Sequence, residues 1–156
     1  MASGCGASAT IGPAPNTGPT VAELPSAAVH NDADVTFATA VVVLHRRAVA
    51  AAAPAAQGAT EPRVKALAAE VLAVDQPEID SLTSYLQAWD APVPAEQPGV
   101  APDRSFLDTV LTSTPDVVAA ARREQQTGRY EPARELAGLI LTEQTARVDR
   151  ARSLRG

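Results

Sequence analysis

The sequence contains few of the side chains that carry most protein chemistry. Its 156 residues include one cysteine, one methionine, one tryptophan and two histidines, and aromatic residues make up only 3%. A single cysteine excludes an intramolecular disulfide, and two histidines leave few candidates for general acid–base catalysis. The sequence also has no Gly-x-Ser-x-Gly nucleophile motif, no Glu-x-x-His motif and no phosphate-binding glycine loop. We therefore expect the protein not to be an enzyme.

Excess positive charge and long apolar runs are missing as well. The net charge is −5 at pH 7, whereas a nucleic-acid binder needs a basic stripe for the phosphate backbone. A membrane-spanning helix needs about 20 consecutive apolar residues, and the apolar run at 48–56 is short and contains Pro54. We expect neither nucleic-acid binding nor a membrane-spanning helix.

Alanine and valine supply most of the apolar side chains that are present. Hydrophobic residues make up 46% of the sequence, and a chain of this length can bury a real core. Alanine favours helix and occupies little space, which favours closely packed helices. The length predicts one domain.

Residues 1–28 are rich in Ala, Gly, Pro, Thr and Ser, and prolines from Pro13 to Pro25 block a helix there. We interpret this segment as a flexible tether. Within it, residues 2–8 (Ala-Ser-Gly-Cys-Gly-Ala-Ser) resemble a bacterial lipobox, in which small residues precede a cysteine that becomes lipidated. Ala2 stands where that pattern usually has leucine, and no basic and apolar signal region precedes it.

The lipobox resemblance implies lipidation at Cys5. The protein would then be extracytoplasmic and anchored by lipid to the bacterial cell membrane, with a cell-envelope protein as a candidate partner. The alternative is a chance cysteine in a tail of small residues.

Apolar residues recur at helical spacing in four segments after the tether. Pro77 should kink the second helix near residues 73–74, and Pro115 should interrupt the third. Capping residues, prolines and glycines set the expected bounds. The expected helices run from Asn31 to Pro54 or Gly58, from Thr60 as cap to Trp89, from Pro102-Asp103 to Gly128, and from Tyr130 or Glu131 to about residue 154.

The second half of the chain repeats the first at a constant shift of 69 residues, without a gap. Asp34 corresponds to Asp103 and Phe37 to Phe106, and such matches are harder to obtain by chance than matches of alanine. Two hairpins that each expose an apolar face can bury those faces against one another. The repeat therefore predicts an all-α, antiparallel four-helix bundle of ferritin-like type at residues 29–154, with halves at about 31–89 and 100–154. Further matches are Val41 with Val110, Val49 with Val118, Leu67-Ala68 with Leu136-Ala137, Val71-Leu72 with Ile140-Leu141, and Asp80 with Asp149.

Several short motifs in the bundle segment resemble the domain of unknown function 305 family. They are residues 31–37 (Asn-Asp-Ala-Asp-Val-Thr-Phe), His45-x-x-Ala48-Val49, Leu67-Ala68, Val71-Leu72 and Glu78-Ile79. The resemblance covers residues 31–152. It implies a ferritin-like bundle, often secreted or attached to the envelope, and in several members linked to copper. The methionine and histidine ligands of the family pattern suit copper, because the soft thioether favours the reduced ion.

The chain departs from the family pattern at nearly every ligand position. Its only methionine is Met1, so a Met/His copper site of the family type cannot be assembled. The family's methionine positions fall on Ala40, Val41, Ala51 and Leu82 in the first half and on Thr109, Val110 and Ala120 in the second. The histidine pair falls on Leu44-His45 and Ser113-Thr114, and the Gln and Glu positions fall on Asp75 and Glu78, then on Gln144 and Arg147.

His45, Asp75 and Glu78 are the remaining candidate metal ligands. Asp75 and Glu78 are three residues apart and share a helix face, and His45 could face them if the first two helices pack as the family resemblance implies. One imidazole and two carboxylates could hold a borderline ion such as zinc or copper. The alternatives are a histidine paired with a carboxylate at a helix interface, and a histidine exposed beside Arg46-Arg47.

Two other features have a structural and a functional interpretation. Tyr85 and Trp89 either fill one end of the bundle or anchor a partner. Arg122-Arg123 and the Arg-rich end (Arg147, Arg150, Arg152, Arg155) are either a solvated helix face or a basic strip for anionic lipid. Taken together, the sequence predicts a non-enzymatic cell-envelope lipoprotein whose bundle is a binding or structural module, with the family's metal site largely lost. The alternative is a metal-binding, copper-handling protein with a reduced site around His45.

Overall fold

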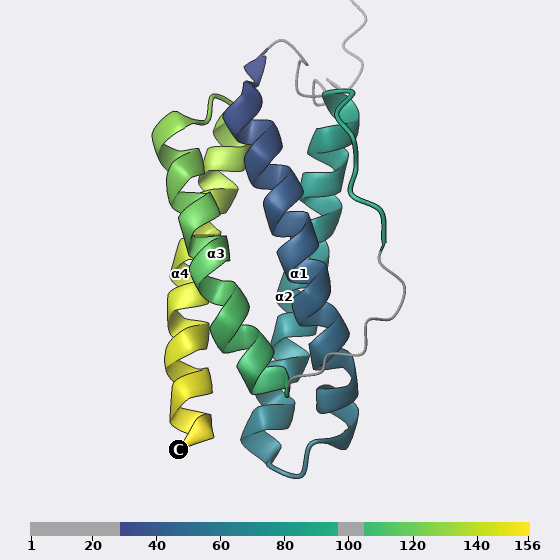
Figure 1. The fold of residues 1–156 in the computed structure, drawn as a ribbon, viewed down its shortest axis with the longest axis vertical. Helices are drawn as coiled ribbons and strands as arrows, with labels where there is room; N and C mark the ends of the chain where they lie inside the picture. Colours follow the sequence, from purple (N-terminus) through teal and green to yellow (C-terminus); the bar gives the residue numbers. More distant parts are fainter. Residues whose placement is uncertain (1–28, 97–104) are drawn as a thin grey trace, which may run out of the picture.

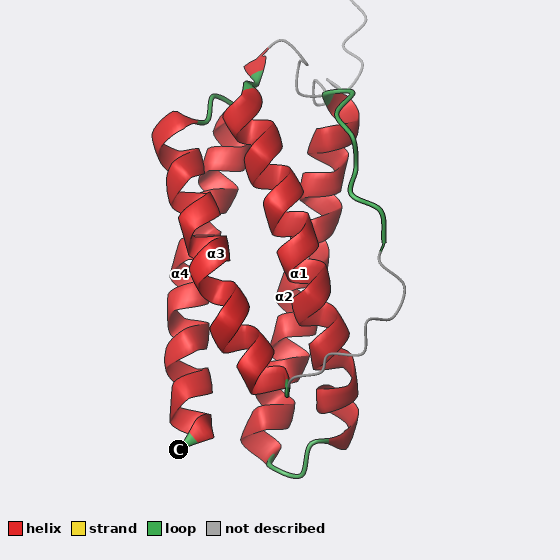
Figure 2. Cartoon of the chain, viewed as in Figure 1, coloured by secondary structure: helices red, strands yellow, loops and turns green. Residues whose placement is uncertain are grey.

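The computed structural model describes residues 29–96 and 105–156, and Cys5 and the expected tether lie outside these residues. The described part consists of helices joined by loops, without a strand (Figure 2). The all-α four-helix fold is thus confirmed. The helices are α1 (Asp32–Gly58), α2 (Pro62–Ala88), α3 (Phe106–Thr127) and α4 (Glu131–Arg155).

The helices form two antiparallel hairpins that lie side by side, α1 with α2 and α3 with α4 (Figure 1). Each helix packs against two others: α1 against α2 and α3, and α4 against α3 and α2. The start of α1, the end of α2 and the α3–α4 turn meet at the upper end in Figure 1, where residues 90–96 leave α2 and run along the outside. We call this the upper end.

Local hydrogen bonds fix where the helices begin. At α1, the Asn31 side chain accepts the N–H groups of Ala33 and Asp34, and the Asp34 carboxylate accepts the Asn31 N–H at 2.5 Å, which is a capping box. α2 begins after Glu61, whose side chain accepts an N–H of its own first turn. The prediction of Thr60 as that cap is therefore wrong.

Prolines do not end or interrupt the helices. Pro54, Pro77 and Pro115 lie inside α1, α2 and α3, so the expected interruption at Pro115 is wrong. All three prolines are exposed, so water can satisfy the carbonyl group that loses its partner. α3 also begins later than expected, because Ser105 is its cap and accepts the Asp108 N–H at 3.4 Å.

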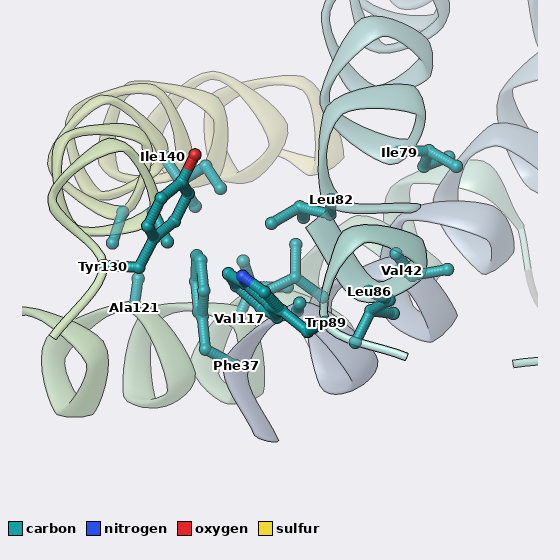
Figure 3. Close-up of a cluster of buried hydrophobic side chains, with 14 residues drawn as sticks. Phe37, Val42, Ile79, Leu82, Leu86, Trp89, Val117, Ala121, Tyr130 and Ile140 are labelled. Atoms are coloured by element: carbon teal, nitrogen blue, oxygen red, sulfur yellow. The ribbon is translucent and has the colours of Figure 1, made fainter. Parts of the chain in front are cut away.

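Two apolar clusters form the core. The upper cluster joins all four helices and contains Phe37, Leu82, Trp89, Tyr130 and Ile140 (Figure 3). The lower cluster is built largely from small and branched residues around Leu67, Val71, Phe106 and Val110. Burying one large apolar side chain stabilises the fold by about 1.5–3 kcal/mol. Between these two clusters, each of the four helices carries at least one buried polar side chain.

Among the described residues, α1 is long and apolar enough to cross a membrane, judged by length and composition only. Its most apolar 18-residue stretch has a mean hydropathy of 1.4. This corrects the expectation that no segment reaches that length. A core helix passes the same test, and α1 buries Phe37, Ala38, Val41 and Val42 in the upper cluster. We therefore interpret its hydropathy as that of a helix that supplies apolar side chains to the core.

Gly128 at the α3–α4 turn is expected to resist substitution. A Cβ added there would overlap the Glu124 carboxyl group and lie 2.7 Å from the Glu124 carbonyl oxygen. Gly128→Ala should therefore lower the free energy of unfolding by about 1–3 kcal/mol through overpacking, measured by urea denaturation. Gly58→Ala is the matched control, because its Cβ would meet nothing within 4 Å and alanine favours helix. Equal effects of the two substitutions would contradict this account of the turn.

Candidate functional site

A single layer of polar side chains crosses the bundle between the two apolar clusters. The first half supplies His45, Asp75 and Glu78, and the second half supplies the residues 69 positions later. All six side chains are buried. The repeat therefore places equivalent positions of both halves at the same level of the bundle. We call His45, Asp75, Glu78, Thr114, Gln144 and Arg147 the polar layer.

The structure brings the three candidate ligands of the first half together. The His45 Nε2 atom lies 2.7 Å from Glu78 Oε2, and Nδ1 lies 3.7 Å from Asp75 Oδ2. Potential ligand atoms of the three residues lie within 4.8 Å of one another. His45 is only 1% exposed, so it is not a surface histidine beside Arg46-Arg47. The geometry is that of an imidazole held between two carboxylates of one helix face.

Arg147 supplies a positive charge to the same layer from α4. Its Nη2 donates to Asp75 Oδ1 at 2.6 Å and its Nη1 donates to Asp75 Oδ2 at 3.2 Å, while the Arg147 side chain is 3% exposed. A bidentate Arg–carboxylate pair is among the strongest polar contacts in proteins. It connects α4 to α2 across the interior. Both Asp75 oxygens are therefore already bound by the protein itself.

Sequence reasoning placed Arg147 in an exposed basic strip, and that assignment is wrong. The other arginines of the Arg-rich end are exposed but have acidic neighbours: Arg150 pairs with Glu70, and Arg155 with Asp108 at 2.9 Å. Arg152 lies 3.9 Å from Asp149. The repeat contained the signal for Arg147, because it corresponds to Glu78 and so to an inward position.

The remaining polar-layer residues of the second half offer little to a cation. Thr114 Oγ1 donates to the Val110 carbonyl at 2.7 Å and lies 3.2 Å from Gln144 Oε1. Neither side chain carries a charge. The ionisable ligand candidates of the layer thus come from the first half alone.

Glu143 borders the polar layer from α4. Burial raises the pKa of Glu143, the negative charge of Glu78 and a hydrogen bond with it raise that pKa further, and Arg147 opposes these effects. Sequence reasoning missed this residue, because it stands one position before the expected inward Gln144. These effects favour the uncharged form of Glu143 beside the Glu78 carboxylate.

The donor set of the layer does not fit the copper chemistry of the family. Residues 29–156 contain no methionine or cysteine, so the soft ligands that select copper(I) are absent from the bundle. Two carboxylates face one guanidinium and one imidazole, so the carboxylates already have partners within the protein. Within this layer, His45 pairs with Glu78 and Arg147 pairs with Asp75.

Tyr85 and Trp89, the candidate partner contacts, lie at the upper end. Trp89 is 6% exposed, stacks on His30 at a centroid distance of 4.9 Å and meets the edge of Tyr130 at 5.3 Å (Figure 3). Tyr85 also meets Tyr130, at 5.1 Å. This packing is that of a plug, and the interpretation as a partner anchor stays a prediction.

The fold matches solved structures at low sequence identity. CopM in the Cu(I)-bound form aligns with a TM-score of 0.69 and 22% identity, over 78% of this chain and 94% of that chain. A DUF305 fragment from Deinococcus radiodurans aligns with a TM-score of 0.67 and 17% identity, over 81% and 97%. CopM in the Cu(II)-bound form gives 0.65 and 21%, over 78% and 94%. These similarities establish the fold.

The sequence comparisons give the family. No curated protein matches the sequence. The family model described as Domain of unknown function (DUF305) matches residues 34–100. That match covers α1 from Asp34 onward, α2 and most of the first-half motifs, and the whole bundle has the fold of the DUF305 fragment. The resemblance found in the sequence is thus confirmed, because residues 34–100 of this chain match the DUF305 family model.

Proposed function

We propose that this protein is a non-enzymatic helical-bundle module of the bacterial cell envelope, held at the membrane by a lipid on Cys5. In this proposal the polar layer is an internal structural network, and the module acts through its surface and its position. The observation that supports a structural role for the polar layer is the Arg147 guanidinium, which binds Asp75 inside the layer.

Electrostatics supports a structural role for the layer. A divalent ion beside His45 would lie close to the buried Arg147 charge, and like charges at short range in a medium of low dielectric repel strongly. The ion would also have to compete with Arg147 for the Asp75 oxygens. Removing Arg147 from Asp75 would leave a buried charge without a partner, which costs several kcal/mol.

A second candidate function is binding of a borderline divalent ion such as zinc. The observation that favours it is the cluster of His45, Asp75 and Glu78, with ligand atoms within 4.8 Å. Three protein ligands of this type are found in zinc sites. The cluster lies at family ligand positions, and the CopM structures of the same fold hold copper or silver.

Metal titration separates the two functions. Zinc and copper(II) are titrated into the purified chain by calorimetry, and copper(I) is titrated in competition with a chromophoric chelator. His45→Ala is compared with His30→Ala, which removes the other histidine. We expect no tight one-to-one binding in any of the three proteins. One-to-one binding that disappears in His45→Ala but remains in His30→Ala would overturn the structural interpretation in favour of the metal site.

The lipid anchor has a separate test. Mass spectrometry of the protein from a native membrane fraction is expected to show Cys5 as the N-terminal residue with attached acyl chains. An unmodified Cys5 in that fraction would remove the anchor from the proposal. This result is independent of the metal titration, because the anchor and the polar layer lie in different segments.

A further inference from the structure

Two carboxyl groups meet at the upper end of the bundle, away from the polar layer. Asp34 comes from the first turn of α1 and Glu124 from the last turn of α3, and both side chains are 0% exposed. The Asp34 carboxylate accepts N–H groups from Asn31 at 2.5 Å, Arg129 at 3.0 Å and Tyr130 at 2.9 Å. Asp34 thereby ties the start of α1 to the α3–α4 turn and to the start of α4.

Glu124 has a different environment. Both its carboxyl oxygens are buried, and none of the described N–H or O–H groups donates to them. Its side chain is hydrogen-bonded to Asp34. Two carboxyl groups can share a hydrogen bond only if one of them carries a proton. Because the Asp34 oxygens already accept N–H groups, the proton belongs on Glu124, which donates to Asp34.

We propose that Asp34 and Glu124 form a shared-proton latch that holds the start of α1 against the α3–α4 turn and loosens when Glu124 loses its proton. The latch consists of these two side chains and the N–H groups of Asn31, Arg129 and Tyr130. It is a pH-sensitive device at the point where residues 1–28 join the bundle.

The charges around the pair fix the direction of the effect. Burial, the hydrogen bond to Asp34 and the negative charge of Asp34 raise the pKa of Glu124 from 4.5 to about 8, and Arg134 of α4 opposes them. Burial also opposes ionisation of Asp34, but the hydrogen bonds from Glu124 and the three N–H groups outweigh it and lower the pKa of Asp34. Tyr85 of α2 and Trp89, which follows α2, pack against Tyr130 at this end.

The sign of the pH dependence follows from linkage. The folded pKa of Glu124 lies above its ordinary value, so the stability that the latch contributes is complete below about pH 4.5. This contribution is lost as the pH rises through about 8. The lowered pKa of Asp34 acts only at the acid end, below its ordinary value of 3.8.

Water has a short path to Glu124. A surface pocket of about 210 Å³ lies between α1 and α3 and is lined by Thr36, Phe37, Asp116, Arg123 and Glu124, among others. Ionised Glu124 would face the Asp34 carboxylate in a buried space, and like charges this close repel. Rotation toward the pocket and Arg123 would hydrate Glu124. Such a rotation would remove its hydrogen bond to Asp34.

The test uses the full chain over the range from about pH 5 to about pH 9, which spans the expected titration. NMR measures the side-chain ¹³C carboxyl shift of Glu124 and the exchange of the Arg129 and Tyr130 amide hydrogens, corrected for intrinsic base catalysis. We expect Glu124 to titrate near pH 8 and the two amides to lose protection over the same range. In Glu124→Gln the amide group donates to Asp34 at every pH, so protection should stay constant.

Glu135→Gln, an exposed glutamate on α4, is the matched control and should behave as wild type. Titration of Glu124 near 4.5 would overturn the proposal. So would equal pH profiles of amide protection in wild type and Glu124→Gln. If Glu124→Gln does not fold, the carboxyl titration of the wild-type chain decides the question alone.

Discussion

Arg147→Ala is expected to lower the free energy of unfolding by about 3–5 kcal/mol, because it removes one partner of a buried ion pair. The substitution leaves the Asp75 carboxylate at 0% exposure without the two N–H donors that it has in the wild type. An unpaired buried charge must take up a proton or draw in water, and both responses cost free energy. Urea denaturation followed by circular dichroism at neutral pH measures the loss.

Two controls show whether the effect arises from burial. Arg150→Ala removes an arginine that pairs with Glu70 at the surface, where an ion pair is worth about 0–1 kcal/mol. The double variant Asp75→Leu with Arg147→Met replaces the buried pair by apolar side chains and should recover most of the lost stability. If Arg147→Ala cost no more than Arg150→Ala, the polar layer would not be a structural network.

Asp34→Ala is expected to lower the free energy of unfolding by at least about 3 kcal/mol, because it removes the acceptor of three N–H groups. A hydrogen bond to a charged group contributes about 1.5–3 kcal/mol, and the Asn31 side chain still caps α1 in this variant. The Tyr130 N–H, which is buried, would have no replacement partner. The same urea denaturation measures this loss.

Asp32→Ala is the matched control for Asp34→Ala. Both aspartates lie in the first turn of α1, but Asp32 is exposed. Its interaction with the helix dipole is worth about 0.3–1 kcal/mol. Similar losses for the two variants would show that Asp34 acts only as a local first-turn charge and does not join α1 to α4.

The internal repeat explains why the fold could be predicted from the sequence. A gapless shift brings Phe37 and Phe106, and likewise Asp75 and Gln144, to equivalent inward positions, so two similar hairpins follow from one pattern. The family resemblance and the three-residue spacing of Asp75 and Glu78 placed His45 opposite these two carboxylates, and the structure brings the three residues together. Single prolines and capping residues predicted the ends of the helices less reliably. An exposed proline such as Pro115 does not interrupt a helix that packing holds in place.

The partners of the buried charges could not be predicted in the same way. Arg147 and Asp75 are 72 residues apart, and the pairing depends on how α4 lies against α2. Asp34 was recognised as a helix-start residue, but its contacts with Arg129 and Tyr130 cross 95 and 96 residues. Glu124 carries no local signal at all. Such contacts are set by the packing of the helices.

The polar layer occupies the positions at which the family resemblance implies ligands from both halves of the bundle. In this chain the corresponding positions remain buried and polar, but Arg147 supplies a cation from within the protein. The layer therefore still joins α2 to α4.

The most direct test of this account is a crystal structure of the full chain grown with excess zinc or copper and measured at the absorption edge of each metal. We expect no anomalous peak between His45 and Glu78, and we expect the Arg147 guanidinium to bind both Asp75 oxygens. An anomalous peak coordinated by His45, Asp75 and Glu78, with Arg147 displaced from Asp75, would contradict it.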